Sequence, residues 1–319
     1  MTYGAAPERL DVFTGGEAMG LLLASDARTL RRADDFVRGV AGSESNVAVG
    51  LARLGHRVAF AGRVGADSVG GWVRDTLRAE GVDLASLITD PALPTGLLLR
   101  DSPLTRPVSV SYYRSESAGA AVDVGDVPEH VVSGARAVFL SGITPMLSAS
   151  AARFTDRMLS VAAEADVPVF FDPNVRLRLA DRESWRAVVS YLDRVDTLLI
   201  GHGELGLLGL PDDPVKLLSG RLNTVVVKRG ADGATVTTSD GTVHEPAIPA
   251  PLIDPVGAGD AFCAGWISAW LRGRSPSESV REANAVASFV VATATDIAGL
   301  PTSEERDWAM RGDRTDVDR

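Results

Sequence analysis

Hydrophobic residues along the chain fall into two alternating patterns. Short, continuous runs of β-branched and aromatic residues are separated by longer stretches in which apolar positions recur at the spacing of an amphipathic helix. The expected strands cover residues 57–62, 135–142, 167–172, 196–201 and 223–230. The expected helices cover residues 45–54, 68–80, 150–164, 182–195, 257–271 and 276–294. Continuous apolar strands that alternate with helices predict an α/β fold, with a mainly parallel sheet covered by helices on both faces.

Two segments depart from this rhythm. Residues 18–40 and 93–116 carry short alternating stretches, such as "TGLLLRD" and "VSVSYYR", and neither segment contains an expected helix. They predict a small antiparallel sheet that is inserted into the core domain as a lid. From Ser303 the chain is charged and low in large aliphatic residues, which predicts a short helix and a frayed tail. We therefore expect one domain over residues 10–302, followed by a C-terminal helix and tail over 303–319.

The composition excludes several classes of protein. Of 319 residues, 45% are hydrophobic and 23% charged, which is ordinary for a soluble globular chain. The net charge of −10 argues against a nucleic-acid surface, which needs a basic face. Cys263 is the single cysteine, so an internal disulfide is impossible. With neither a signal-peptide pattern nor an apolar run long enough for a membrane span, we expect a cytoplasmic protein without nucleic-acid or membrane partners.

One glycine pattern imitates a dinucleotide-binding loop. "GHGELG" (201–206) follows an expected strand and opens a helix, as such a fingerprint does. The next expected strand, however, ends in Lys228 and Arg229 instead of the acidic residue that would hold a ribose hydroxyl. A nicotinamide site is therefore a distant alternative. A Walker A loop is excluded, because neither Lys216 nor Lys228 stands in its G-K-[ST] context.

The segment "IDPVGAGDAFCAG" (253–265) carries the strongest chemical signal. Gly257, Ala258 and Gly259 have little or no side chain, so their N–H groups can converge on an anion at the start of a helix. Asp260 follows in the first turn. A carboxylate beside an anion site suits phosphoryl transfer, in which it accepts the proton of the attacking hydroxyl. The structural alternative is a glycine-rich helix entry with an aspartate cap.

Three segments resemble the ribokinase-like (PfkB) carbohydrate kinases. "DPVGAGDAF" is similar to their C-terminal motif, and "GVAGSESNVAVGLARLG" (39–55) to their N-terminal glycine-rich motif. "GRVGADSVG" (62–70) is similar to a third family segment. The resemblance implies a ribokinase-like fold with a small β-sheet lid, ATP and Mg²⁺ as cofactors, and Asp260 as the general base. It also implies a homo-oligomer that associates through the lid.

Within this family the chain resembles the 2-keto-3-deoxygluconate kinases. The similar segments are "SYYR" (111–114), "SAG" (117–119), "LSGITP" (140–145) and "DPNVR" (172–176). The resemblance implies phosphorylation of the terminal hydroxyl of a sugar acid. Leu98 stands where those enzymes tend to carry a tyrosine, so fructokinase and 5-dehydro-2-deoxygluconokinase activities stay open. A non-catalytic sugar- or nucleotide-binding regulator on the same fold is the alternative from another class.

A sugar acid is an anion, so a chain of negative net charge needs local arginine to bind it. Arg114 ends an expected lid strand, and Tyr112 lies two residues earlier on the same strand face. In the N-terminal motif, Gly42 allows close approach and Asn46 can bond sugar hydroxyls, although the neighbouring serines could instead cap the helix. The candidate substrate residues, the last of them implied only by the resemblance, are Gly42, Asn46, Tyr112, Arg114 and Asp296.

The nucleotide residues follow largely from the resemblance. "KRGADG" (228–233) is similar to the strand-end turn that holds ATP in the family. Arg176 follows a core strand, where it could reach substrate or nucleotide phosphates, and the family pattern favours the nucleotide. The candidate nucleotide residues are Asn174, Arg176, Lys228, Gly230, Gly233 and Asn284.

Magnesium is implied to be organised through water by Glu204, which matches the glutamate of the family's N-x-x-E element. Two residues depart from the family pattern: Gly201 replaces the asparagine or serine of that element, and Val175, in the segment "NVR", replaces the aromatic residue often found there. Whether a monovalent cation binds near Asp254 stays open.

Overall fold

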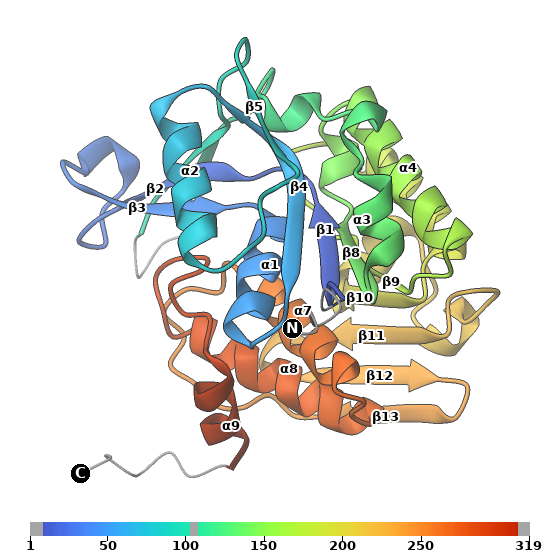
Figure 1. Cartoon of the computed structure of the whole chain (residues 1–319). Coiled ribbons are helices and arrows are strands. Elements are labelled where there is room, and N and C mark those ends of the chain that lie inside the picture. Colours follow the sequence, from blue (N-terminus) through green and yellow to red (C-terminus); the bar gives the residue numbers. More distant parts are fainter. Residues whose placement is uncertain (1–8, 103–107, 312–319) are drawn as a thin grey trace, which may run out of the picture.

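The computed structural model describes residues 9–102 and 108–311, which form a large and a small sheet (Figure 1). The large sheet has nine strands in the order β13-β12-β11-β10-β9-β8-β1-β4-β5. Its strands are β1 Val12–Gly15, β4 Val58–Gly65, β5 Leu87–Asp90, β8 Ala137–Ser141, β9 Val169–Asp172, β10 Thr197–Gly201, β11 Thr224–Lys228, β12 Ala234–Thr238 and β13 Gly241–Glu245. Pairing is parallel from β11 to β5 and antiparallel in the β11–β12–β13 edge. The predicted mainly parallel sheet is confirmed, whereas β1, β5 and the β12–β13 edge hairpin were not predicted.

Helices cover both faces of this sheet (Figure 1). One apolar layer involves α1 Ser43–Arg53, α2 Ser68–Ala79, α7 Ala258–Leu271 and α8 Pro276–Val290. The other involves α3 Glu129–Gly134, α4 Ala149–Glu164, α5 Arg182–Trp185 and α6 His202–Leu208. The predicted C-terminal helix is α9, Ser303–Arg311, and the expected tail beyond it lies outside the described residues. None of the helices described here combines the length and the apolar character that a membrane crossing requires.

Strand β9 shows why the core strands read as continuous apolar runs. Phe170 points to the α7 side, where its ring lies 5.1 Å from that of Trp270. Phe171 points to the opposite side, where its ring lies 5.9 Å from that of Tyr191. Successive side chains of a strand face opposite sides of the sheet, so a sheet covered twice needs apolar residues at every position.

The segment predicted as one helix over residues 182–195 is only partly α-helical. After α5, residues Arg186–Arg194 form a 3₁₀ helix. Trp185, Val188 and Tyr191 are buried at intervals of three residues. This spacing fits the three residues per turn of a 3₁₀ helix, which keeps the stripe facing the core.

The small sheet projects from the core beside α2, where β2 and β3 are drawn in blue (Figure 1). Its strands are β2 Met19–Ala24, β3 Phe36–Ala41, β6 Leu97–Arg100 and β7 Val110–Tyr113, in the order β3-β2-β6-β7. The sheet was predicted to be antiparallel, which is wrong for one pair: β2 and β6 are parallel. Strand β2 follows β1 along the chain, and β6 follows β5. Because β1 and β5 run in the same direction in the large sheet, the chain enters β2 and β6 in the same direction. Residues 103–107 of the second expected lid segment lie outside the described residues.

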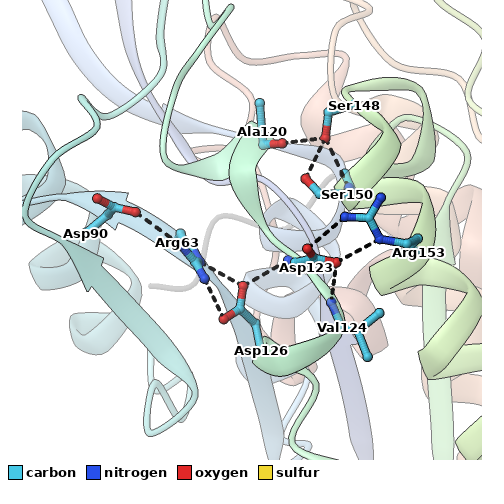
Figure 2. A network of polar contacts seen from close by, with 10 residues as sticks. Arg63, Asp90, Ala120, Asp123, Val124, Asp126, Ser148, Ser150 and Arg153 are labelled. Carbon is cyan, nitrogen blue, oxygen red and sulfur yellow. Dashed lines mark hydrogen bonds and ion pairs between the residues drawn. The ribbon is translucent and has the colours of Figure 1, made fainter.

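A polar network joins strands β4 and β5 of the large sheet to the chain that returns from the small sheet (Figure 2). Arg63 on β4 forms ion pairs with Asp90 at 3.1 Å and with Asp126 at 2.7 Å. Asp123 accepts hydrogen bonds from Arg153, on α4. Asp90 precedes the excursion into β6 and β7, and Asp123 and Asp126 follow it. The network therefore holds together the two points at which this part of the chain leaves and re-enters the core.

Candidate active site

A cavity of about 530 Å³ lies between the small sheet and the α7 entrance. The small sheet contributes an apolar wall that includes Met19, Leu98 and Tyr112. The predicted site residues that line the cavity are Gly42, Asn46, Tyr112, Arg114, Asn174, Arg176, Gly257, Gly259, Asp260 and Asp296. Residues predicted from five separate stretches of sequence are thus brought to one place.

The entrance to α7 is shaped by backbone geometry. Gly257 has a φ of 83°, and a Cβ at this position would lie 2.9 Å from the carbonyl oxygen of Asp296, so glycine is required. The N–H of Ala258 donates to the carbonyl of Pro255 at 3.3 Å, which makes this predicted donor less available. Helix geometry leaves the N–H groups at the start of α7 without intrahelical acceptors, next to the positive end of the helix dipole. The turn is therefore built to receive an anion.

Three side chains hold the carboxylate of Asp260. Ser43 Oγ donates to Oδ1 and Asn46 Nδ2 donates to Oδ2, each at 2.8 Å. Asn174 Nδ2 lies 3.2 Å from Oδ1 and 2.8 Å from Ser43 Oγ. The donors come from α1 and from the loop after β9, so two distant segments fix the carboxylate in the cavity wall.

The environment makes Asp260 less acidic than an ordinary aspartate. Burial raises the pKa of this carboxyl, while hydrogen bonds from Asn46 and Ser43 and the charge of Arg176 oppose the rise. A carboxylate with a raised pKa that is fixed beside a cavity has the properties of a general base.

The N-terminal motif has a different role from a helix cap. Ser43 and Ser45 do not cap α1: Ser43 Oγ bonds Asp260, and Ser45 Oγ donates to the carbonyl of Gly42. A Cβ at Gly42 would lie 2.2 Å from the carbonyl oxygen of Glu17, so glycine is needed for chain packing as well as for the cavity. The contribution of Ser43 to the site was missed, because a serine at the start of a helix has the typical pattern of a cap.

Arg114 is held in the cavity wall by a buried acid. It forms an ion pair with Glu17, and its guanidinium carbon lies 5.3 Å from the centroid of the Tyr112 ring. Burial raises the pKa of Glu17, and the charge of Arg114 opposes this effect. Among the described residues, Nε of Arg114 has no hydrogen-bond partner. It is therefore a free, buried donor beside the cavity.

Beneath the α7 entrance lies a buried ion pair. Lys228 Nζ is 2.5 Å from Asp172 Oδ2 and 3.6 Å from the position that a Cβ of Gly259 would occupy. Burial disfavours the charged form of Lys228, but the neighbouring Asp172 carboxylate outweighs it and raises the pKa of the lysine. The ammonium group of Lys228, paired with Asp172, thus lies next to the anion-binding turn.

Glu204 lies close to this pair and accepts hydrogen bonds from two main-chain N–H groups. Its Oε1 accepts from the N–H of Val175 at 2.6 Å, and its Oε2 from the N–H of Gly201 at 2.7 Å. The departures at these two positions leave both contacts intact, because only main-chain atoms take part. The glutamate of "GHGELG" therefore closes the first turn of α6, as a helix cap does.

Gly230, Gly233 and Asn284 do not line the cavity. Gly233 has a φ of 85°, and a Cβ there would lie 2.1 Å from the carbonyl oxygen of Glu245. Asn284 Nδ2 donates to the carbonyls of Glu245 at 3.2 Å and Pro246 at 3.0 Å. Gly233 and Asn284 thus support one segment at the end of β13, whereas a Cβ at Gly230 would meet no other atom within 4 Å.

Across residues 9–102 and 108–311, no group of three or more His, Cys, Asp or Glu side chains could hold a metal ion. Magnesium typically takes one or two carboxylates and completes its shell with phosphates and water. The described residues therefore form no cage of protein ligands for this ion.

Residues 11–303 match the pfkB family of carbohydrate kinases. The chain belongs to the PfkB family. The 2-dehydro-3-deoxygluconokinase of Bacillus subtilis is 34% identical to this kinase over 316 residues, which are 96% of this chain and 97% of the relative. The predicted family and the class of sugar kinase are confirmed.

Solved structures agree with this assignment. A PfkB protein from Polaromonas sp. JS666 has a TM-score of 0.84 and 34% identity, and the alignment covers 93% of this kinase and 99% of that chain. An Escherichia coli protein described as a ribokinase II, in complex with ATP and Mg²⁺, has a TM-score of 0.86 and 22% identity over 95% and 99% of the two chains. The predicted ribokinase-like fold with a small second sheet is confirmed.

A buried acid close to the site was not predicted. Glu44, on the first turn of α1, accepts a hydrogen bond from Thr144 Oγ1 at 2.6 Å and is 1% exposed. Burial raises the pKa of Glu44 to about 8, and the nearby charges of Asp260 and Glu17 add to the rise. In the sequence this glutamate has the pattern of an exposed first-turn acid, which gives no sign of its burial.

Replacement of Glu44 by glutamine should change the pH dependence of stability. The pKa of Glu44 is about 8 in the folded chain against 4.5 ordinarily. The free energy of unfolding of the wild type should therefore fall as pH rises between those values, because the unfolded chain releases this proton more readily than the folded chain. The glutamine of Glu44→Gln does not titrate, so this variant lacks that pH-dependent loss of stability. We expect its free energy of unfolding in urea, relative to wild type, to increase steadily from pH 5 to pH 8. The exposed Glu278→Gln is the control, and a parallel pH dependence of Glu44→Gln and wild type would contradict the prediction.

Proposed function

We propose that this kinase transfers the γ-phosphoryl group of ATP to the terminal hydroxyl of 2-keto-3-deoxygluconate, giving 2-keto-3-deoxy-6-phosphogluconate and ADP. The observation that carries the proposal is the Asp260 carboxylate, fixed in the cavity wall beside the amino end of α7. The name of the Bacillus subtilis relative supports the choice of sugar. A non-catalytic regulator would not need a buried carboxylate of raised pKa at this place.

The proposed step is an in-line displacement. The sugar hydroxyl gives its proton to Asp260 as its oxygen bonds the γ-phosphorus, and the bond from that phosphorus to the β–γ bridging oxygen breaks. The N–H groups of Gly257, Gly259 and Asp260, with a lesser part for Ala258, donate to the transferred phosphoryl group. The carboxylate can still accept the proton, since it has about four acceptor positions in all. The small sheet acts as the lid that excludes water from the cavity.

ATP and Mg²⁺ are the proposed cofactors, supported by the Escherichia coli structure that contains both. Lys228 places its charge beneath the turn that would hold the γ-phosphate. Gly233 and Asn284 would act on the nucleotide indirectly, through the segment that they support, and Gly230 through the turn that its positive φ of 58° allows. Magnesium, when bound, supplies positive charge that offsets the charge of the phosphates. Glu204 would act on it through water.

The charge of the cavity favours an acidic sugar. Arg114 and Arg176 both line it, in a chain of net charge −10. Arg176 shares this cavity with Asp260, so we propose that it lies within reach of the sugar acid as well as of the phosphates. Leu98 makes its side of the cavity apolar, which removes one hydroxyl contact and keeps fructose and 5-dehydro-2-deoxygluconate as alternative substrates.

Three expectations stay predictions. The cytoplasmic location and the monovalent cation are untested, although Asp254 already has the guanidinium of Arg100 at 2.7 Å. The homo-oligomer through the small sheet is supported only by the exposed side chains of Phe36, Val37 and Tyr113.

Asp260→Asn should abolish most of the phosphorylation. An asparagine keeps the shape of the side chain but cannot take the proton, so we expect kcat to fall by about 10²–10⁴-fold. ATP binding by calorimetry and the thermal unfolding midpoint should stay close to wild type. Full activity of this variant in a coupled ADP-release assay would remove Asp260 from the mechanism.

The double variant Glu17→Gln/Arg114→Met should lose its preference for acidic sugars. It removes both charges of the buried pair, and so avoids the unpaired carboxylate that Arg114→Met alone would leave. We expect kcat/KM for 2-keto-3-deoxygluconate to fall by about 10-fold or more, with a change of about 3-fold or less for fructose. The matched control is Arg38→Met, at an exposed position of β3. An equal loss for acidic and neutral sugars would contradict the proposed role of Arg114.

A further inference from the structure

Arg100 is a buried arginine at the end of β6 that the proposed reaction does not use. It is 1% exposed, although it belongs to the small sheet. Its Nη2 lies 2.7 Å from Asp254 Oδ2 and donates to the carbonyl of Ala294 at 3.0 Å. Its Nη1 lies 3.2 Å from Asp296 Oδ1. One guanidinium therefore joins the small sheet to two separate segments of the core.

These two segments form the walls of the α7 entrance. Asp254 precedes the turn, and its Oδ1 accepts a hydrogen bond from the N–H of Val256 at 3.0 Å. On the other side, the backbone of Asp296 is in contact with Gly257, where a Cβ would lie 2.9 Å from its carbonyl oxygen. The position of Gly257 thus depends on both carboxylate-bearing segments, and Arg100 spans them.

The electrostatics require this bridge. Asp254 and Asp296 are two carboxylates of low exposure, at 13% and 8% of their side-chain surface. Burial raises the pKa of Asp296 to about 6, and the charge of Arg100 opposes the rise, while Asp260 and Asp254 add to it. Without the guanidinium the carboxylates would repel each other in a site of low dielectric. The two segments would then move apart, or one of the two carboxylates would take up a proton.

We propose that Arg100 is a positioning residue that couples the small sheet to the phosphate-binding turn. While β6 lies over the cavity, its guanidinium holds the Asp254 and Asp296 segments in place and keeps Gly257 in the conformation that receives the phosphoryl group. When β6 moves away, the turn loses this support. Closure of the lid and formation of the anion site are then one event. The catalytic consequence rests on the proposed function, whereas the structural coupling does not.

Arg100→Lys is the decisive variant, because it keeps the charge but has one ammonium group in place of a fork that reaches two carboxylates. The control is Arg38→Lys, at an exposed position of the lid strand β3, where the guanidinium carbon lies 5.1 Å from the centroid of the Trp72 ring. Hydrogen–deuterium exchange would be measured on the complete chain without ligands. We expect about 10-fold faster exchange in peptides covering 253–258 and 292–298 for Arg100→Lys, and wild-type rates for the control.

Kinetics provide the second readout. With the sugar acid and ATP, kcat of Arg100→Lys should fall by about 10-fold or more, while both KM values change by about 3-fold or less, because the turn acts mainly on the transition state. Unchanged exchange in both peptides would overturn the proposal, as would kcat within about 2-fold of wild type. If Arg100→Lys does not fold, Asp254→Asn takes its place, and unchanged exchange over 292–298 then overturns the coupling. A wild type that phosphorylates no sugar refutes the proposed function alone, since the exchange experiment still decides the coupling.

Discussion

The site depends on one buried carboxylate that must stay oriented without losing its ability to take a proton. A carboxylate of this kind is stable only when hydrogen-bond donors surround it. In this kinase Ser43, Asn46 and Asn174 provide them for Asp260. The requirement links α1, the loop after β9 and the first turn of α7, which are far apart in the sequence. Their common position at one end of the large sheet follows from this link.

The parallel sheet makes such a meeting possible. The carboxyl ends of neighbouring parallel strands lie along one edge, so the loops after them converge. Asp172 ends β9 and Lys228 ends β11, and their ion pair lies directly beneath the turn before α7. The edge thus places a paired lysine ammonium under an anion-binding turn, with the base beside it. This arrangement suits phosphoryl transfer to a hydroxyl.

Local signals in the sequence account for much of the fold and for the centre of the site. Apolar runs and helical periods predicted strands β4, β8, β9, β10 and β11 but missed β1 and β5, and the glycines of 257–259 with Asp260 predicted the turn and its acid. The parallel pairing of β2 and β6 was missed, because strand direction in the small sheet depends on where each strand leaves the core. The 3₁₀ helix after α5 was also missed, since its three-residue stripe was taken for the period of an α-helix.

Partners that are set only by tertiary packing could not be predicted from sequence. Arg100 is one arginine among many in an arginine-rich chain, and nothing in "TGLLLRD" indicates that it is buried between two carboxylates. Glu17 and Glu44 likewise resemble surface acids. Motifs specify the groups that touch a ligand, whereas the residues that hold those groups are recognised only once the chain is folded.

The proton acceptor is tested most directly by the pH dependence of kcat/KM in wild type and in Ser43→Ala. Ser43 donates to the ionised form of Asp260 and lowers its pKa, so removal of the hydroxyl should raise that pKa further. A base works only when ionised, and the acid limb of the profile should therefore move to higher pH in Ser43→Ala, with the alkaline limb unchanged. An acid limb at the same pH in both proteins would contradict the assignment of Asp260 as the base.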